Sequence, residues 1–116
     1  MRVFKNKEEY DLIISSFEEK AKSLGEDVSF ETKTIGEESG EVYVAYFKKP
    51  NLLASVKAMD MVSGRQPIGA GLMLFPVCFI KSESDHEFDT KDSWKMGICA
   101  KLGLGIEVDF PDIKKK

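Results

Sequence analysis

The segment from Val42 to Met61, VYVAYFKKPNLLASVKAMDM, joins a strand pattern directly to a helix pattern. Pro50 has no N–H to give to a strand ladder and is favoured at the start of a helix, so we expect the strand to end there and a helix to run to about Val62. The strand part is rich in β-branched and aromatic residues on both of its faces. One face carries Val42, Val44 and Tyr46, and the other carries Tyr43, Ala45 and Phe47.

The residues before this junction predict a helix and a partner strand. Asn6 and Glu9 form a capping-box pattern at the start of a helix over 6–24. The apolar residues of this helix share one face: Tyr10, Ile13, Ile14, Phe17, Ala21 and Leu24. Residues 27–35 alternate with a period of two, and the loop 36–40 has a glycine at each end to supply positive φ. We therefore predict an antiparallel hairpin whose apolar face is covered by the first helix.

The residues after the junction predict further helices. Gly64 is expected to end the helix that follows Pro50, and Pro67 to start another. Pro76 is expected to kink or end that second helix, so that 77–80 forms either a buried connector or a short strand. Residues 82–92 are polar and acidic and predict a surface loop.

The last part of the chain predicts one more helix, in which Trp94, Ile98 and Leu102 recur every four residues. Asp89 or Thr90 is expected to cap it. Residues 104–110 alternate between apolar and polar or small residues, so they form either a third strand beside the hairpin or a continuation of this helix. The predicted fold is α+β: an N-terminal helix on a β-hairpin, followed by a small helical bundle.

Length and charge limit the classes of protein to consider. The 116 residues predict a single domain, residues 1–116, because two domains would each bury too small a core. The net charge of −3 argues against nucleic-acid binding, which favours a basic surplus. The N-terminal residues lack the apolar core of a signal peptide, and the apolar run 68–80 is too short to span a membrane. We expect a cytoplasmic protein with no membrane partner.

No motif predicts catalysis, a metal or a cofactor. His86 is the only histidine, and no nucleophile motif surrounds any serine. The acids at Asp85, Glu87 and Asp89 resemble the start of a calcium loop, but its glycine and final glutamate are missing. Gly69-Ala70-Gly71 and Gly103-Leu104-Gly105 lack the third glycine of a dinucleotide fingerprint. Cys78 and Cys99 lack zinc-site spacing and are expected to be buried thiols. We therefore predict a protein that is not an enzyme.

Several large apolar residues on the two middle helices suggest a binding surface. At helical spacing such residues more often form a core, and the alternative is an adaptable groove for a partner segment. The candidate interaction residues, on helices 50–63 and 66–75, are Leu52, Leu53, Val56, Met59, Leu72 and Phe75.

The order of these features resembles the tail assembly chaperones of long-tailed phages and prophages. The resemblance rests on the aromatic segment 44–50, which ends in Lys49-Pro50 and is followed by a helix with Ala54, Ala58 and Met59. The break at 66–68, the stop at 76–79, the acidic loop 83–85 and the pattern Leu102-Gly103-Leu104-Gly105-Ile106 follow in consistent order. Departures are Asn51-Leu52-Leu53 where a basic residue is usual, the glycines at 69 and 71, and the missing tryptophan at the stop.

The resemblance implies a non-enzymatic chaperone in the cytoplasm of a bacterial host. Such proteins coat the helical tape-measure protein, or contact other tail proteins, during tail assembly, and they associate with themselves along it. An amphipathic partner helix is recognised by an apolar groove flanked by mixed charge. The alternative is a small structural or ligand-binding α+β domain of unrelated origin, which a closed monomer with a buried pocket and no exposed apolar groove would favour.

Overall fold

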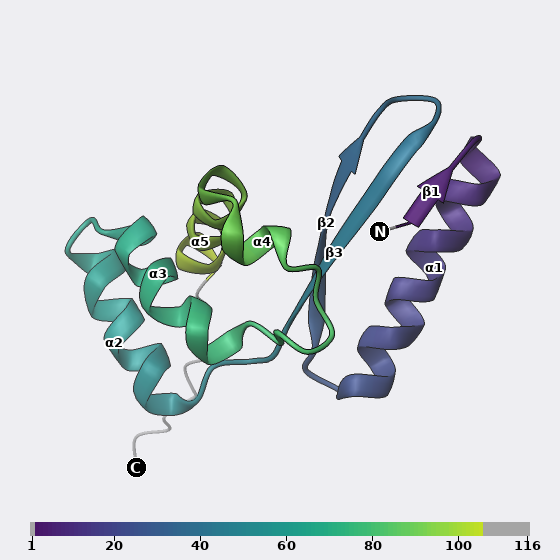
Figure 1. Ribbon diagram of the computed structural model, residues 1–116. Helices are drawn as coiled ribbons and strands as arrows, with labels where there is room; N and C mark the ends of the chain where they lie inside the picture. Colours follow the sequence, from purple (N-terminus) through teal and green to yellow (C-terminus); the bar gives the residue numbers. More distant parts are fainter. Residues whose placement is uncertain (1, 106–116) are drawn as a thin grey trace, which may run out of the picture.

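The computed structural model describes residues 2–105 and shows an α+β fold in which a small sheet separates one helix from a group of helices (Figure 1). The sheet is antiparallel with strand order β1-β3-β2. The elements in chain order are β1 (Arg2–Phe4), α1 (Lys7–Leu24), β2 (Ser29–Ile35), β3 (Gly40–Phe47), α2 (Leu52–Ser63), α3 (Pro67–Cys78), α4 (Glu87–Thr90) and α5 (Asp92–Leu104). The predicted fold class is confirmed.

The first helix forms as the sequence predicts. The Asn6 side chain accepts a hydrogen bond from the backbone N–H of Glu9 at 2.8 Å, and the Glu9 carboxylate accepts one from the backbone N–H of Lys5 at 2.7 Å. These bonds satisfy donors that have no partner inside the helix. Phe17 and Ala21 are buried against the sheet, so the apolar face of α1 covers the hairpin.

Strand β3 is the centre of the molecule because both of its faces are buried. Val42, Val44 and Tyr46 pack with Phe17 of α1 in one core. The alternate residues Ala45 and Phe47 pack in a second core with α2, α3 and α5, and half-buried Tyr43 packs against it. The predicted division of the strand into two faces is confirmed. The sheet thus lies between two apolar cores, which places it between α1 and the helical group in Figure 1.

The third strand of the sheet is N-terminal, which the sequence did not predict. β1 pairs with β3, with Arg2 opposite Val42 and Phe4 opposite Gly40. Three residues are too few to show a period of two. Of the alternative third strand over 104–110, Leu104 is instead the last residue of α5 and Gly105 caps that helix, whereas 106–110 lie outside the described residues.

The edge of β3 that β1 leaves open is covered by the chain that follows α3. The backbone N–H groups of Ile80 and Asp85 donate to the carbonyls of Tyr46 and Val44, each at 2.9 Å. Ser84 Oγ accepts from the Tyr46 N–H, and the Asp85 carboxylate accepts from the Val44 N–H, each at 2.8 Å. A buried strand needs these partners. The predicted surface loop over 82–92 is therefore wrong in part: it is bonded to β3 and contains α4, whose Phe88 is buried.

Helix α3 continues through Pro76 to Cys78. Pro76 was expected to kink or end this helix, and an end there is wrong, although a proline inside a helix costs roughly 3 kcal/mol. The residues on either side of it, Phe75 and Cys78, are buried in the second core, and this packing holds the last turn in place. The sequence predicts a buried connector or a short strand over 77–80, but Val77 and Cys78 belong to α3, and Phe79 forms only a single antiparallel bridge with Phe47.

Helices α3 and α5 cross so closely that glycine backbones form the contact. A Cβ added at Gly71 would lie 1.6 Å from the carbonyl oxygen of Cys99, and one added at Gly103 would lie 1.8 Å from that of Pro67. Neither position has room for any side chain. Gly69-Ala70-Gly71 and Gly103-Leu104 therefore lie within helices that pack together rather than in loops that hold a phosphate.

Other helix ends differ from expectation in detail. Asn51, not Pro50, starts α2: its side chain accepts from the N–H of Ala54 at 2.8 Å. Asparagine can satisfy a free helix N–H, and Pro50 precedes this cap. The positive φ at the end of α2 belongs to Arg65 (62°), one residue after Gly64. In the hairpin loop Gly36 has positive φ (105°), whereas Gly40 has not. Lys91 precedes α5, and neither Asp89 nor Thr90 caps it.

Candidate functional site

The outer face of α2 exposes large apolar side chains. The helix packs on the rest of the molecule through its small residues Ala54 and Ala58, which are buried. The larger Leu52, Leu53 and Val56 point away from this contact and are 81%, 65% and 47% exposed. Exposed apolar residues scattered singly need no explanation, but a group of them on one helix marks an interaction site.

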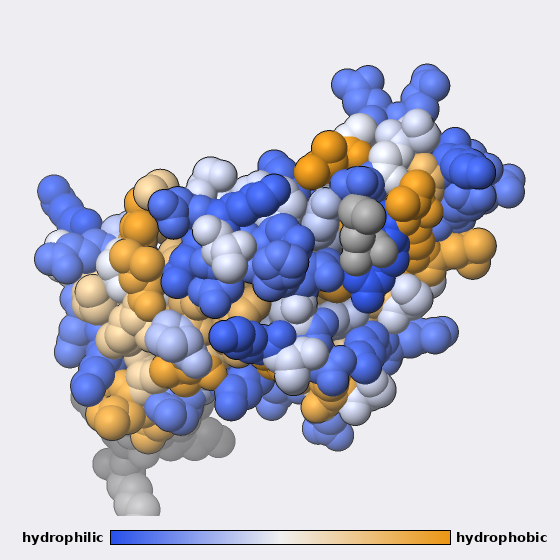
Figure 2. Space-filling view, in the orientation of Figure 1, coloured by the Kyte–Doolittle hydropathy of each residue, from blue (hydrophilic) through white to orange (hydrophobic). Residues whose placement is uncertain are grey.

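Helix α3 adds to this surface. It packs beside α2, and its Ile68 and Leu72 are 45% and 54% exposed. Figure 2 shows hydrophobic residues gathered over the end of the molecule formed by α2 and α3, at the left of the view. We call the exposed residues Leu52, Leu53, Val56, Ile68 and Leu72 the α2–α3 surface.

The six predicted interaction residues differ in their exposure. Leu52, Leu53, Val56 and Leu72 are exposed in the α2–α3 surface, and Met59 is half-buried. Phe75 is only 3% exposed: its ring stacks on Phe79 with the centroids 4.6 Å apart. Phe75 therefore supports this surface from the core. Ile68 is a member that the interpretation of the sequence left out of the site, although it shares a helical face with Leu72.

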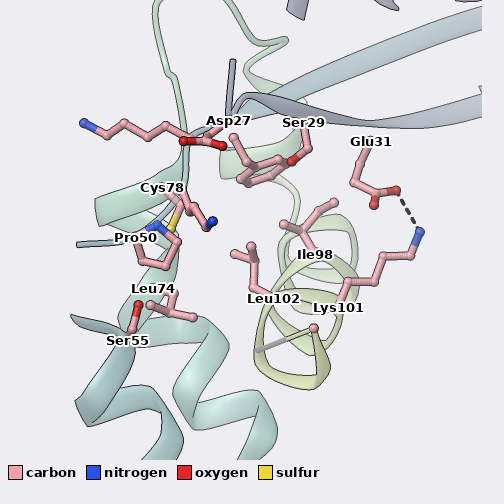
Figure 3. Close-up of a pocket in the computed structure, with 14 residues that line it drawn as sticks. Asp27, Ser29, Glu31, Pro50, Ser55, Leu74, Cys78, Ile98, Lys101 and Leu102 are labelled. Atoms are coloured by element: carbon pink, nitrogen blue, oxygen red, sulfur yellow. Dashed lines mark hydrogen bonds and ion pairs between the residues drawn. The ribbon is translucent and has the colours of Figure 1, made fainter. Parts of the chain in front are cut away.

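A cavity of about 390 Å³ opens beside Pro50, at the junction between β3 and α2. Its apolar walls come from β3, α3 and α5. Figure 3 shows Ile98 and Leu102 of α5 on one side of the cavity and Pro50 and Cys78 on the other. The sequence did not predict this cavity because its walls come from segments far apart in the chain. The sequence predicts only that a strand ends at Lys48-Lys49-Pro50, three residues that line the cavity.

The charged side chains around the cavity are partly paired. Lys101 Nζ lies 2.8 Å from Glu31 Oε2 across one end, as the dashed line in Figure 3 shows. Lys48 and Lys49 are exposed beside the cavity, and Asp27 lies two residues before the start of β2.

The residues considered for catalysis are not brought together. The His86 side chain is 78% exposed, and its Nε2 lies 3.2 Å from Oε1 of the adjacent Glu87. Asp85 Oδ2 accepts from the Val44 N–H and lies 3.5 Å from Arg2 Nη1, so this carboxylate fastens the loop to the sheet. Among the described residues, no three His, Cys, Asp or Glu side chains are placed to hold a metal ion.

The two cysteines are buried thiols, as predicted. Cys78 and Cys99 are 1% and 0% exposed, and the structure has both free. Burial raises the pKa of each thiol above its ordinary value, because an apolar environment disfavours the thiolate. Nearby Lys48 and Lys95 oppose this effect on Cys78 and Cys99 respectively. A raised pKa lowers the thiolate fraction on which nucleophilic attack depends.

Comparison of the chain with protein-family models, with curated proteins and with solved structures gives no match. Within residues 2–105, no helix has both the length and the apolar character needed to cross a membrane. Function must therefore be argued from the α2–α3 surface, the cavity and the order of motifs along the chain.

Proposed function

We propose that the protein is a non-enzymatic binding protein that takes up a hydrophobic helical segment on its α2–α3 surface. The observation that carries this proposal is the inverted arrangement of α2, which buries alanines and exposes Leu52, Leu53 and Val56. Keeping these side chains in water forgoes roughly 1.5–3 kcal/mol for each one that burial would stabilise. A partner that covers them recovers that free energy.

A helical partner fits the spacing of these residues. Leu52, Val56 and Met59 follow one another at intervals of four and three, which is the spacing of a helical seam. Such a seam receives the apolar stripe of an amphipathic helix. Lys57 and Asp60 are exposed on the same helix, so the surface carries both signs of charge.

The order of motifs along the chain supports a more specific role. We propose that the protein acts as a tail assembly chaperone of a long-tailed phage or prophage. Its partner would be the tape-measure protein, with the complex in the cytoplasm of the bacterial host and further copies associating along the same helix. In this role, covering the apolar stripe of a long helical protein keeps that protein soluble while the tail-tube subunits assemble.

The decisive experiment is co-expression with the tape-measure protein encoded nearest to this gene, followed by co-purification. We expect a soluble complex with the unaltered chain and at least a tenfold loss of affinity with the double variant Leu52→Ser/Val56→Ser. The matched control, Leu12→Ser/Met96→Ser, removes two apolar side chains that are 71% and 59% exposed elsewhere. Circular dichroism checks that each variant is folded. Equal losses in both variants, or no complex with the unaltered chain, would show that the proposal is wrong.

A further inference from the structure

The cavity beside Pro50 has an apolar lining and an opening lined by charges. Phe47, Leu74, Cys78, Ile98 and Leu102 all contribute to its walls. Its volume of about 390 Å³ is within the range of sites that hold a small apolar group. Ser29 and Ser55 also line the cavity, but a polar group placed against the apolar walls would find no partner, so the part of a ligand that packs there is itself apolar.

The charges at the opening favour an anion next to that apolar group. Glu31 is neutralised by Lys101 at 2.8 Å, which leaves Asp27 as the other acid at the opening. Lys48 and Lys49 are adjacent in the chain, both exposed, and neither forms an ion pair with another residue in the range 2–105. The opening therefore has a surplus of positive charge, although the chain as a whole is acidic with a net charge of −3.

The cavity is continuous with the first turn of α2. Pro50 and Ser55 line it, and Ser55 lies in the same turn as Leu52, the most exposed residue of the α2–α3 surface. In Figure 3 Pro50 and Ser55 lie on the side of the cavity where α2 begins. A helix lying along the outer face of α2 therefore reaches the cavity at one of its ends.

We propose that this cavity anchors the bound helical segment at one end. It receives a large apolar side chain of the partner, and Lys48 and Lys49 bind an acidic residue one helical turn away from that side chain. This inference rests on the proposed function and adds a sequence preference to it: the partner segment carries an apolar residue and an acidic residue three or four positions apart. The cavity determines which partner sequence is preferred, whereas the α2–α3 surface provides most of the apolar contact area.

The test uses three fluorescein-labelled amphipathic peptides of about 18 residues, long enough to form a helix on binding. They share a leucine stripe and a terminal tryptophan for the cavity, and they differ in carrying glutamate, glutamine or lysine one turn from that tryptophan. Fluorescence anisotropy measures the dissociation constants. We expect the glutamate peptide to bind about tenfold more tightly than the lysine peptide, because Lys48 and Lys49 attract the glutamate and repel the lysine.

Three variants separate the cavity from the surface. Lys48→Gln/Lys49→Gln should reduce the tenfold preference to less than twofold and leave the affinity for the glutamine peptide unchanged. The matched control Lys22→Gln/Lys33→Gln removes the same charge from residues that do not line the cavity, and it should keep the preference. Ser55→Phe fills the cavity at its α2 side and should weaken all three peptides about equally.

The outcomes distinguish the two proposals. If all peptides bind and Leu52→Ser/Val56→Ser weakens them, but Lys48→Gln/Lys49→Gln keeps the glutamate preference, the cavity inference is wrong and the proposed function stands. If no peptide binds, both are wrong. Analytical ultracentrifugation identifies another occupant: if Ser55→Phe changes the self-association of the free protein, the cavity holds a second copy of the chain and the inference is wrong.

Discussion

Cys78 and Cys99 show how burial sets the chemistry of a single residue in this protein. Both thiols lie in the second core, on helices that face one another, and burial raises the pKa of each. A group whose pKa is higher in the folded state stabilises the fold at pH values below its unfolded pKa. That stability is lost as the pH rises, because the unfolded chain then releases a proton that the folded chain keeps.

The two thiols should therefore make stability fall at alkaline pH. Their ordinary pKa is 9.0, so the loss should begin near this pH. Between pH 8 and pH 9.5 we expect the free energy of unfolding to fall by at most about 1.5 kcal/mol, the limit reached when both thiols stay protonated in the folded state. Urea unfolding at each pH measures it. Cys78→Ala/Cys99→Ala should lower stability at neutral pH and flatten this dependence, and an equally steep dependence in that variant would contradict the assignment.

At the scale of elements, close approach decides which residues the helices present. Ala54 and Ala58 allow α2 to lie near its neighbours, and glycines at 71 and 103 allow the backbones of α3 and α5 to touch. A helix normally buries its larger apolar residues, but α2 buries its smaller ones. The same property that tightens the helical group leaves Leu52, Leu53 and Val56 in water.

Gly71→Ala tests the helix crossing. Alanine favours a helix by about 1 kcal/mol over glycine, but its Cβ would lie 1.6 Å from the Cys99 carbonyl oxygen and would force α3 and α5 apart. We expect a net loss of about 2 kcal/mol or more in thermal or urea unfolding. Gly97 is the control, since nothing lies within 4 Å of a Cβ added there. Gly97→Ala should stabilise the protein by up to about 1 kcal/mol, and a gain at Gly71 would show that the crossing is loose.

The elements that sequence predicts well are those with a long, regular period. α1 and the β2–β3 hairpin follow from spacing, caps and the loop glycine Gly36, and β3 divides into two buried faces as its alternation indicates. β1 has only three residues, and α4 only four, so neither shows a period. The prediction for Pro76 considers only the free energy that a proline costs inside a helix. The helix continues through Pro76 because its neighbours Phe75 and Cys78 are buried in the second core. These failures share one cause: contacts between distant segments outweigh local preference.

For the α2–α3 surface, the sequence predicts which residues take part but not whether they face the core or the solvent. The stripe of large apolar residues on α2 is visible in the sequence, but periodicity gives the same pattern for a core face and for a binding face. The contact of Ala54 and Ala58 with the rest of the fold resolves this, and no local pattern contains that information. The cavity was not predictable at all, because Phe47, Leu74 and Ile98 meet only in the folded chain.

At the scale of the whole molecule, β3 couples the two cores. Val44 contributes to the core under α1, while its neighbour Ala45 contributes to the core under the helices. The hydrogen bonds from the segment around Ser84 and Asp85 tie the helical half to the same strand. If β3 unfolds, both cores lose the residues that this strand contributes. We therefore expect the described residues to unfold as one cooperative unit.

Phe17→Leu tests this coupling because Phe17 and the single tryptophan lie on opposite sides of the sheet. Phe17 is 1% exposed in the core under α1, whereas Trp94 packs against the other core, with its ring 5.1 Å from that of Tyr43. The variant should lower stability by roughly 1–2 kcal/mol through lost packing. Trp94 fluorescence and far-UV circular dichroism should report the same lowered urea midpoint, as two-state unfolding requires. If Trp94 keeps the unaltered midpoint while the dichroism of the variant unfolds in two steps, the cores are independent. In that case β3 belongs to one of them, and the α2–α3 surface could be studied on the helical half alone.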